Sequence, residues 1–360
     1  MRVCLLNPFP LSFRGGTESV LSSLNSELGR RGIETEVISL SESEMGRIPT
    51  FARVLISFIL LRKLQSSQNR FDVIHANAWS ACVLRFIRKK PSLATAHGTV
   101  RGLLNLTGDV APFASRAYSS IFTESLERSG FSSAQKVAAV SHSCMRELID
   151  YYRIPEDKIK VVHNGLDMRK IHRVNTHIRE KFECDHLLFF IGRLAKQKGV
   201  EYLIKALPML EEYDIKLVIA GTGPEETHLR QLVSELKLEP RVAFAGAVDE
   251  RKKLELMSAS DVFICPSLWE SFGMILLEAM ACKLPVVTTR VASIPEVVGD
   301  CGVLVEPRNS RELSDGVRKL LDDKKAAKKL AQKAYCRLTK NFTVERMADG
   351  YIKLYKELTS

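Results

Sequence analysis

Several features that directly indicate the class of a protein are missing from this chain of 360 residues. No apolar run approaches the roughly 18 residues that a membrane-spanning helix needs. The eight cysteines include no C-x-x-C pair, so they are most simply buried, reduced thiols of a cytosolic protein. There is no D-x-D pair of acids to chelate a metal, no fixed-period repeat and no low-complexity segment. We therefore expect a globular protein without a metal or other cofactor.

Two further classes are disfavoured. Arg14-Gly-Gly-Thr-Glu after the first apolar segment lacks the G-x-G-x-x-G spacing of dinucleotide oxidoreductases. The start of the chain is too soon broken by Pro8 to be a signal peptide, so it reads as a core strand and a cytoplasmic location is expected. Four possible metal ligands lie where a domain linker is expected, but their spacing fits no zinc pattern and disfavours a metal site: His172, His177, Cys184 and His186.

Strand-like and helix-like segments alternate along the chain, which predicts parallel sheets with helices on both faces. The pattern restarts after Asn164-Gly165, and the length suits two domains of roughly 100–200 residues each. In the first half the expected strands are 3–7, 36–40, 73–76, 93–97, 136–141 and 159–163. In the second half they are 186–192, 216–220, 242–245, 262–265, 285–288 and 302–305.

Residues 266–281 are the most informative stretch. A short apolar strand ends at Pro266, Phe272-Gly273 gives a turn, and a run of good helix formers follows from Met274. The start of a helix exposes unpaired N–H groups and favours an anion such as a phosphate, here beside Ser271 through Met274. Glu270 would lie just before that start and Glu278 just inside the helix, where their carboxylates can accept hydrogen bonds from hydroxyls on either side of the phosphate. This arrangement suits a nucleotide sugar.

The same stretch resembles the E-x7-E signature of the retaining glycosyltransferases of family four. Pro-Ser, Phe-Gly, Glu-Ala-Met-Ala and Pro285-Val-Val around the two glutamates make the match specific. The resemblance implies the GT-B fold, an α/β fold of two facing Rossmann-like domains with a cleft between them. It implies an N-terminal domain of residues 1–167, a nucleotide-sugar domain of residues 168–340, and a C-terminal helix, 341–360, that crosses back to the N-terminal domain.

Other segments at strand ends match the same family. Arg193 and Lys198, in Gly-Arg-Leu-Ala-Lys-Gln-Lys-Gly, follow a strand and would face a diphosphate, one as a planar fork and the other as a point charge. The Gly221-Thr-Gly223 turn reads as a wall of the nucleotide pocket. The resemblance places Ala247 and Val248 where the family grips the base through backbone groups.

The N-terminal half contributes Gly15 and Gly16, which open a helix and allow close approach of a phosphate or acceptor. His97 ends a strand and aligns with the active-site histidine of the family. Two departures concern backbone: the family commonly has glycine where Lys283 stands and a glycine pair where Ala292-Ser293 stands. The first costs a favourable helix C-cap and the second makes the loop bulkier, so both bear on donor identity rather than on activity.

The resemblance implies transfer of a sugar from a UDP- or GDP-linked donor to a lipid-linked or glycan acceptor, with retention and without metal. Positive charge at the leaving diphosphate is the largest help to that reaction, and Arg193, Lys198 and the helix start would supply it. Glu270 would orient the sugar and Glu278 would hold the ribose. A non-catalytic nucleotide-sugar-binding protein of the same fold is the alternative, although it would be expected to have lost one of these charged residues.

The charge of the chain bears on the acceptor. The formal charge is +11, and residues 46–105 contain ten Lys or Arg against a single acid, Asp72. Residues 51–64 are apolar with cationic ends and could lie on the anionic cytoplasmic face of a membrane, or form a core helix with a basic rim. Nucleic acid is disfavoured, because no aromatic-rich basic motif accompanies the charge.

Overall fold

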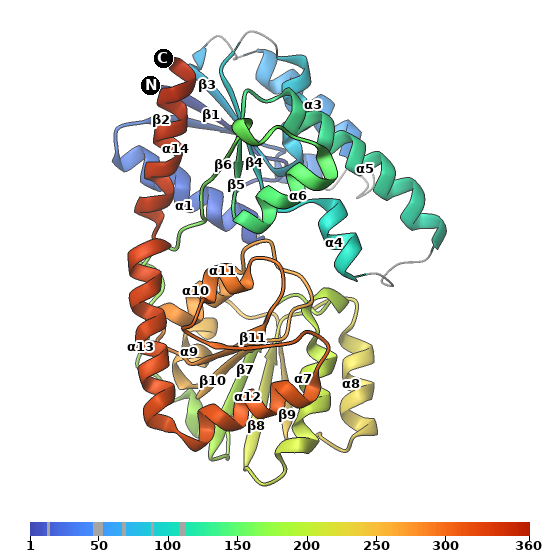
Figure 1. The fold of residues 1–360 in the computed structure, drawn as a ribbon, viewed down its shortest axis with the longest axis vertical. Helices are drawn as coiled ribbons and strands as arrows, with labels where there is room; N and C mark the ends of the chain where they lie inside the picture. The colour runs from blue at the N-terminus through green and yellow to red at the C-terminus, as the bar shows by residue number, and fades with distance from the viewer. Residues whose placement is uncertain (13–14, 46–52, 67–69, 88–89, 108–112) are drawn as a thin grey trace. The chain divides into compact units, whose positions relative to one another are not determined.

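The computed structural model describes residues 1–12, 15–45, 53–66, 70–87, 90–107 and 113–360. Within them the chain forms two compact units, one of Met1–Gly165 with Thr343–Ser360 and one of Leu166–Phe342. Each unit contains a six-stranded parallel sheet with helices packed on it (Figure 1). The predicted α/β class and all twelve predicted strands are confirmed, with boundaries displaced by up to two residues.

The first unit has the strand order β2-β1-β3-β4-β5-β6. Its strands are β1 (Arg2–Leu6), β2 (Glu34–Ile38), β3 (Val73–Asn77), β4 (Ser92–Ala96), β5 (Lys136–Ala139) and β6 (Ile159–Val161). Its helical segments are α1 (Gly16–Arg30), α2 (Glu42–Met45), α3 (Arg53–Gln65), η2 (Ala78–Phe86), α4 (Val100–Thr107), α5 (Phe113–Ser133), α6 (His142–Tyr152) and η3 (Glu156–Lys158). The winding reverses between β1 and β3, and open sheets bind ligands beyond the carboxyl ends of the strands at such a point.

The last helix, α14 (Val344–Thr359), belongs to the first unit. The Thr343 hydroxyl caps it by accepting a hydrogen bond from the Arg346 N–H. Its buried residues recur every three or four positions and pack toward β3, β4 and α1, beside which α14 lies in Figure 1. Tyr355 Oη lies 2.7 Å from His75 Nδ1, and Tyr351 Oη lies 3.0 Å from Thr95 Oγ1. These buried polar contacts fix the helix on the sheet, as the resemblance implied.

Helix α3 covers most of the apolar segment 51–64, for which the sequence allows either a membrane-surface helix or a core helix. Ile56, Leu60 and Leu64 are buried at a four-residue spacing, so this face of the helix is core. Phe58 on another face is 59% exposed, and Lys63 is paired with Glu44. Residues 51 and 52, and the cations at 88 and 89, lie outside the described residues. No helix of the described chain is both long enough and apolar enough to span a bilayer.

The second unit has the strand order β12-β11-β10-β7-β8-β9. Its strands are β7 (His186–Ile191), β8 (Ile215–Ala220), β9 (Val242–Gly246), β10 (Val262–Cys265), β11 (Val286–Thr289) and β12 (Val303–Val305). Its helical segments are η4 (Ile178–Lys181), η5 (Lys196–Lys198), α7 (Val200–Ala206), η6 (Leu207–Leu210), α8 (Glu226–Glu235), α9 (Glu250–Ala259), α10 (Met274–Ala281), α11 (Ile294–Val298), α12 (Ser310–Asp322) and α13 (Lys324–Asn341).

The central strands of this sheet are continuous apolar runs because helices cover both faces. Winding starts at β7, proceeds outward through β8 and β9, and then returns to β10 on the other side of β7. The switch point therefore lies between β7 and β10. Residues that follow these two strands are expected to meet there.

Candidate functional site

The segments that follow β7 and β10 are in direct contact. Gly199 has a left-handed backbone, with φ of +63°, and a Cβ built on it would lie 2.1 Å from the Pro266 carbonyl oxygen. Only glycine permits that approach. The Leu268 N–H donates to the Gln197 carbonyl oxygen at 2.7 Å, which ties the two segments together. The contact places the loop carrying Lys198 against the loop carrying Glu270.

Lys198 and Glu270 form a largely buried ion pair. Lys198 Nζ donates to Glu270 Oε1 at 2.5 Å, and Ser267 Oγ donates to the same oxygen at 2.9 Å. Burial would lower the pKa of Lys198, but the Glu270 carboxylate outweighs it and raises that pKa above its ordinary value. The Ser293 hydroxyl donates to the Glu270 carbonyl oxygen at 2.9 Å and holds the backbone of this loop. Lys198 is thus a fixed cation at the switch point.

Arg193 is exposed, and across the described residues its side chain has no hydrogen-bond or ion-pair partner. Its loop is held by the turn after β8. A Cβ at Gly221 would lie 1.9 Å from the Gly192 carbonyl oxygen, and one at Gly223 would lie 2.2 Å from the Leu194 carbonyl oxygen. The two glycines let the turn pack on the backbone that flanks Arg193. The guanidinium remains available to an anion.

Helix α10 begins at Met274, beside these cations. Its N-cap is Gly273, with φ of +86°, and no side chain caps the first turn. Phe272 is 1% exposed and its ring packs edge-on against Phe342 at 5.8 Å between centroids, so only its backbone can face a ligand. Ser271 is half-buried in the preceding turn. The helix start therefore adds backbone N–H donors and a partial positive charge to those of Lys198.

Glu278 lies in the same helix, but its carboxylate is engaged by a residue that the sequence reading did not identify. Lys253 of α9 places Nζ 2.6 Å from Glu278 Oε2 and 2.8 Å from Glu250 Oε2. Burial raises the pKa of Glu278, and Lys253 opposes that rise. Lys253 is itself only 7% exposed, although lysine is rarely buried unless paired. A ribose bound here would meet a carboxylate already oriented by a lysine.

The residues expected to grip the base follow the edge strand β9. Gly246 has a φ of +64°, and its carbonyl oxygen accepts a hydrogen bond from the Gly221 N–H at 2.7 Å. Ala247 is exposed and Val248 half-buried, and the Asp249 side chain then caps α9. The backbone after β9 is thus joined to the Gly221 turn and is open to solvent.

The candidates of the first unit lie at its own switch point. Gly15 caps α1 without a side chain, and Gly16 is its first residue. A Cβ at Gly16 would meet no described residue within 4 Å, so packing in the described part of the chain does not require glycine there. Glu18 in the first turn is buried, and burial raises its pKa. Room next to an uncapped helix start is consistent with a ligand at this position.

His97 follows β4 and is held by a chain of side-chain amides. Asn7 Nδ2 faces two acceptors, the Phe9 carbonyl oxygen at 2.7 Å and Glu18 Oε1 at 3.4 Å, so Asn7 Oδ1 must accept from Asn77 Nδ2, 2.8 Å away. Asn77 Oδ1 then accepts from His97 Nε2 at 2.8 Å. This order assigns the proton of neutral His97 to Nε2 and leaves Nδ1 as an acceptor.

Burial lowers the pKa of His97 to about 4. The imidazole is therefore neutral at physiological pH, and its Nδ1 can accept a hydrogen bond or a proton. Asn7 and Asn77 were missed in the sequence, although they share a signal with His97. All three stand at the carboxyl ends of the neighbouring strands β1, β3 and β4.

The structure therefore brings Arg193, Lys198 and Glu270 together with the start of α10 in the second unit, and places His97 with Gly15 and Gly16 in the first. The weighed metal ligands do not assemble. The segment that contains His172, His177, Cys184 and His186 is fully described and forms no ligand cluster. His177 instead lies 2.9 Å from Glu180. The second unit thus presents protein cations and backbone donors at the switch point of its sheet.

Two family models match the chain, "Glycosyl transferases group 1" over residues 174–337 and "Glycosyltransferase Family 4" over residues 14–170. The uncharacterized glycosyltransferase MJ1607 of Methanocaldococcus jannaschii is 31% identical over 304 residues, which cover 80% of this chain and 76% of that protein. N-acetyl-alpha-D-glucosaminyl L-malate synthase of Bacillus anthracis is 34% identical over 240 residues, 65% of this chain and 62% of that protein.

Among solved structures, sucrose-phosphate synthase from Thermosynechococcus elongatus superposes with a TM-score of 0.86 at 21% identity, over 99% of both chains. Anabaena HepE in complex with UDP and glucose superposes with a TM-score of 0.78 at 21% identity, over 99% of this chain and all of that one. These similarities extend over both units.

Proposed function

Because the chain belongs to the family 4 glycosyltransferases, the group 1 glycosyl transferases, and has their GT-B fold, we propose that it moves a hexosyl or N-acetylhexosaminyl group from a UDP- or GDP-linked sugar to a lipid-linked or glycan acceptor. The Lys198–Glu270 pair beside exposed Arg193, at the switch point between β7 and β10, carries this proposal. The name of the Bacillus anthracis relative supports an N-acetylglucosaminyl group, and the UDP bound to HepE supports a UDP-linked donor.

The reaction breaks the bond between the anomeric carbon and the phosphate oxygen. The electron pair leaves with the nucleoside diphosphate, so negative charge grows where Arg193, Lys198 and the start of α10 would stabilise it. In the proposed retaining reaction the acceptor hydroxyl attacks the oxocarbenium-like sugar from the face that the phosphate leaves. Its proton passes to the departing phosphate oxygen, and no enzyme nucleophile is used. Glu270 would orient the sugar, and His97 Nδ1 would accept a hydrogen bond from a substrate hydroxyl.

We also propose that no metal takes part in the transfer. The chain has no D-x-D pair, and Lys198 is a protein cation that could neutralise a diphosphate in place of a metal. Turnover should persist in excess EDTA. Complete loss of turnover that magnesium or manganese restores would contradict this part of the proposal.

The experiment that tests the function starts with binding. A thermal-shift panel of UDP-, GDP- and ADP-sugars should identify a donor, since a ligand that binds only the folded state raises the melting temperature. Arg193→Ala should abolish the shift, whereas Lys196→Ala, which removes an exposed charge from the same loop, should retain it. The selected donor is then incubated with lipid and glycan extracts. Binding without hydrolysis or transfer would favour a non-catalytic nucleotide-sugar-binding protein.

From the charge of residues 46–105 we propose that the protein is cytoplasmic and docks on an anionic membrane. Phe58 is exposed on α3, and Arg62 is exposed near its end. Each basic side chain near the surface would contribute on the order of 1 kcal/mol, which salt would weaken. Replacing Arg62 and Phe58 with glutamine should release the protein from anionic vesicles in flotation assays at low salt. Equal flotation of wild type and variant would make a soluble acceptor the better proposal.

A further inference from the structure

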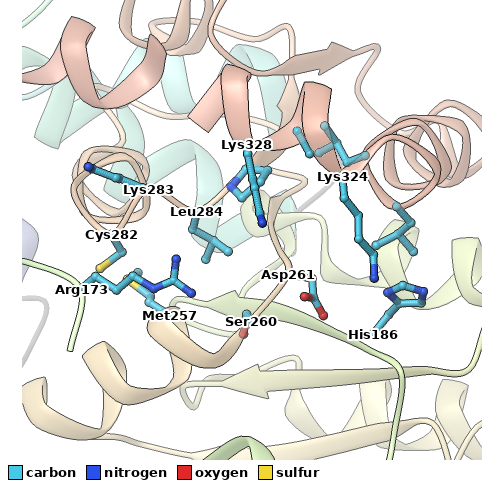
Figure 2. Close-up of a pocket in the computed structure, with 14 residues that line it drawn as sticks. Arg173, His186, Met257, Ser260, Asp261, Cys282, Lys283, Leu284, Lys324 and Lys328 are labelled. Atoms are coloured by element: carbon cyan, nitrogen blue, oxygen red, sulfur yellow. The ribbon is translucent and has the colours of Figure 1, made fainter. Parts of the chain in front are cut away.

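A small cavity of about 130 Å³ lies in the second unit, away from the candidate donor site (Figure 2). It is lined at the amino-terminal edge of the sheet by His186 at the start of β7 and by Asp261 just before β10. Arg193 and Glu270 follow the carboxyl ends of the same two strands. Strands of four to six residues span roughly 13–20 Å, so the cavity and the candidate donor site are on opposite edges of the sheet.

Three cations from two separate segments of the chain line this cavity. Figure 2 shows Lys324 and Lys328 of α13 extending into it from one side and Arg173 from another. Arg173 donates one hydrogen bond, to the Ser258 carbonyl oxygen at 3.2 Å. Within the described chain Lys324 and Lys328 have no ion-pair partner. Lys283 also lines the cavity, but its ammonium lies over the Tyr335 ring, 4.8 Å from the centroid.

The polar groups opposite these cations leave their charge unbalanced. Asp261 is the carboxylate in the lining, and its Oδ2 already lies 2.9 Å from the Arg179 guanidinium and accepts from the Leu187 N–H at 2.8 Å. His186 Nδ1 is buried and has no hydrogen-bond partner among the residues that the structure describes. Buried polar atoms are nearly always paired, so an unpaired one beside a cavity points to a missing partner. A ligand with several acceptor oxygens would supply that partner.

We propose that this cavity is a second anion site of the protein, which binds a phosphate group. A planar guanidinium and two ammonium groups match a tetrahedral dianion, and the volume equals that of about four waters, enough for a phosphate with a small substituent. Helix α13 begins at Lys324, and the Asp323 side chain caps it by accepting from the Ala326 N–H, so the side-chain cations rather than the helix start would hold the phosphate. The phosphate could be inorganic or carried by a small ester, since both present the same oxygens.

The test measures binding of inorganic phosphate and of glycerol 3-phosphate by isothermal titration calorimetry. The Arg193→Ala/Lys198→Ala variant serves as the background, because it removes the cations of the candidate donor site. In that background one equivalent should still bind. Adding Lys324→Gln/Lys328→Gln should weaken binding by roughly tenfold or more, as expected when two charge-assisted contacts are lost.

Lys325→Gln/Lys329→Gln is the matched control, because both residues are exposed on the same helix and neither lines the cavity. This control removes the same net charge but no contact with the bound phosphate. It should therefore change the affinity by less than about twofold. Arg173→Gln, on a different segment, should reproduce the loss seen with the lining lysines. Stronger binding of either ligand identifies the source of the phosphate and supports the site. Equal affinities in the lining and control variants, or no binding in the background, would overturn the proposal, whether or not the protein proves to be a transferase.

Discussion

Replacing Asn77 with aspartate should raise the pKa of His97. The amide oxygen of Asn77 lies 2.8 Å from His97 Nε2, and aspartate puts a carboxylate in nearly the same place. A hydrogen bond to a charged group contributes about 1.5–3 kcal/mol, and one pKa unit corresponds to about 1.4 kcal/mol. The pKa of His97, which burial lowers to about 4, should therefore rise by roughly one to two units.

The same substitution should also lower the stability of the folded protein, which a simple effect of charge on His97 would not explain. A carboxylate cannot donate to Asn7 Oδ1, which would lose the partner that it has at 2.8 Å. An unsatisfied buried acceptor costs about 1–3 kcal/mol, so the variant should also be less stable. Asn7→Ser shortens the other end of the chain and keeps the Asn77–His97 hydrogen bond, so it should lower stability with little change in the pKa of His97.

NMR of histidine-labelled protein measures both the pKa of His97 and the ring nitrogen that carries its proton. The His97→Gln variant assigns the resonance. Ring carbon shifts across pH 3–8 report the pKa of His97, and long-range nitrogen correlations report which ring nitrogen carries the proton. Wild type should show the Nε2–H form. A wild-type ring protonated on Nδ1, or an unchanged pKa in Asn77→Asp, would refute the assignment of the hydrogen-bond chain. Neither measurement depends on the proposed enzymatic activity.

Three further predictions follow from the described contacts. Arg193→Ala and Lys198→Ala should each lower turnover by roughly a hundredfold. Only Lys198→Ala should also lower stability, because it leaves the buried Glu270 carboxylate unpaired. Wild-type turnover in both variants would contradict the assignment of the diphosphate site. Ala292 has a φ of +44°, which is strained for an L-residue. Ala292→Gly should therefore raise the free energy of unfolding by up to about 1 kcal/mol, and an unchanged midpoint in urea would contradict the strain. Burial, reinforced by His97, lowers the pKa of His75 to about 3, so below pH 6.5 the unfolded chain gains a proton there that the folded chain lacks. His75→Gln disturbs the contact with Tyr355 and should lower stability at every pH, but it should also reduce the loss of stability on acidification by up to about 1.4 kcal/mol per pH unit, with no change in the slope above pH 7.

The fold was predictable because its signals are local and repeated. Buried parallel strands are apolar runs bounded by glycine, proline or polar residues, and each of the twelve could be found in this way. The glutamate signature and the basic loop were also readable, since each lies within one short segment. Their meeting at β7 and β10 follows from strand order, which the periodicity of the sequence does not contain but the family resemblance supplied.

Pairings between segments that are distant in the sequence could not be read in the same way. Lys253 reaches Glu278 from another helix, and its place in Glu-Arg-Lys-Lys-Leu-Glu reads as one of several solvent-facing charges. Which of two adjacent lysines turns inward depends on the rotation of α9 about its axis. A difference of one residue corresponds to about 100° of helix rotation, and tertiary packing fixes that angle. Asn77 and His97 pose the same difficulty, since a polar residue at a strand end is common.

Lys283 and Ala292 show how far the fold overrides local preference. Both stand where the family commonly has glycine, and the sequence predicted a lost helix cap at the first of them. The structure keeps the glycine-like backbone instead, with φ of +52° at Lys283 and +44° at Ala292. The Leu284 N–H still donates to the Ala279 carbonyl oxygen at 3.0 Å, which closes the end of α10. An L-residue in this conformation costs roughly 1–2 kcal/mol, so the surrounding packing must favour the turn by more than that amount. The loop that Ala292 belongs to also carries Ser293, which holds the Glu270 backbone, and a strained residue is thereby retained next to the proposed donor site.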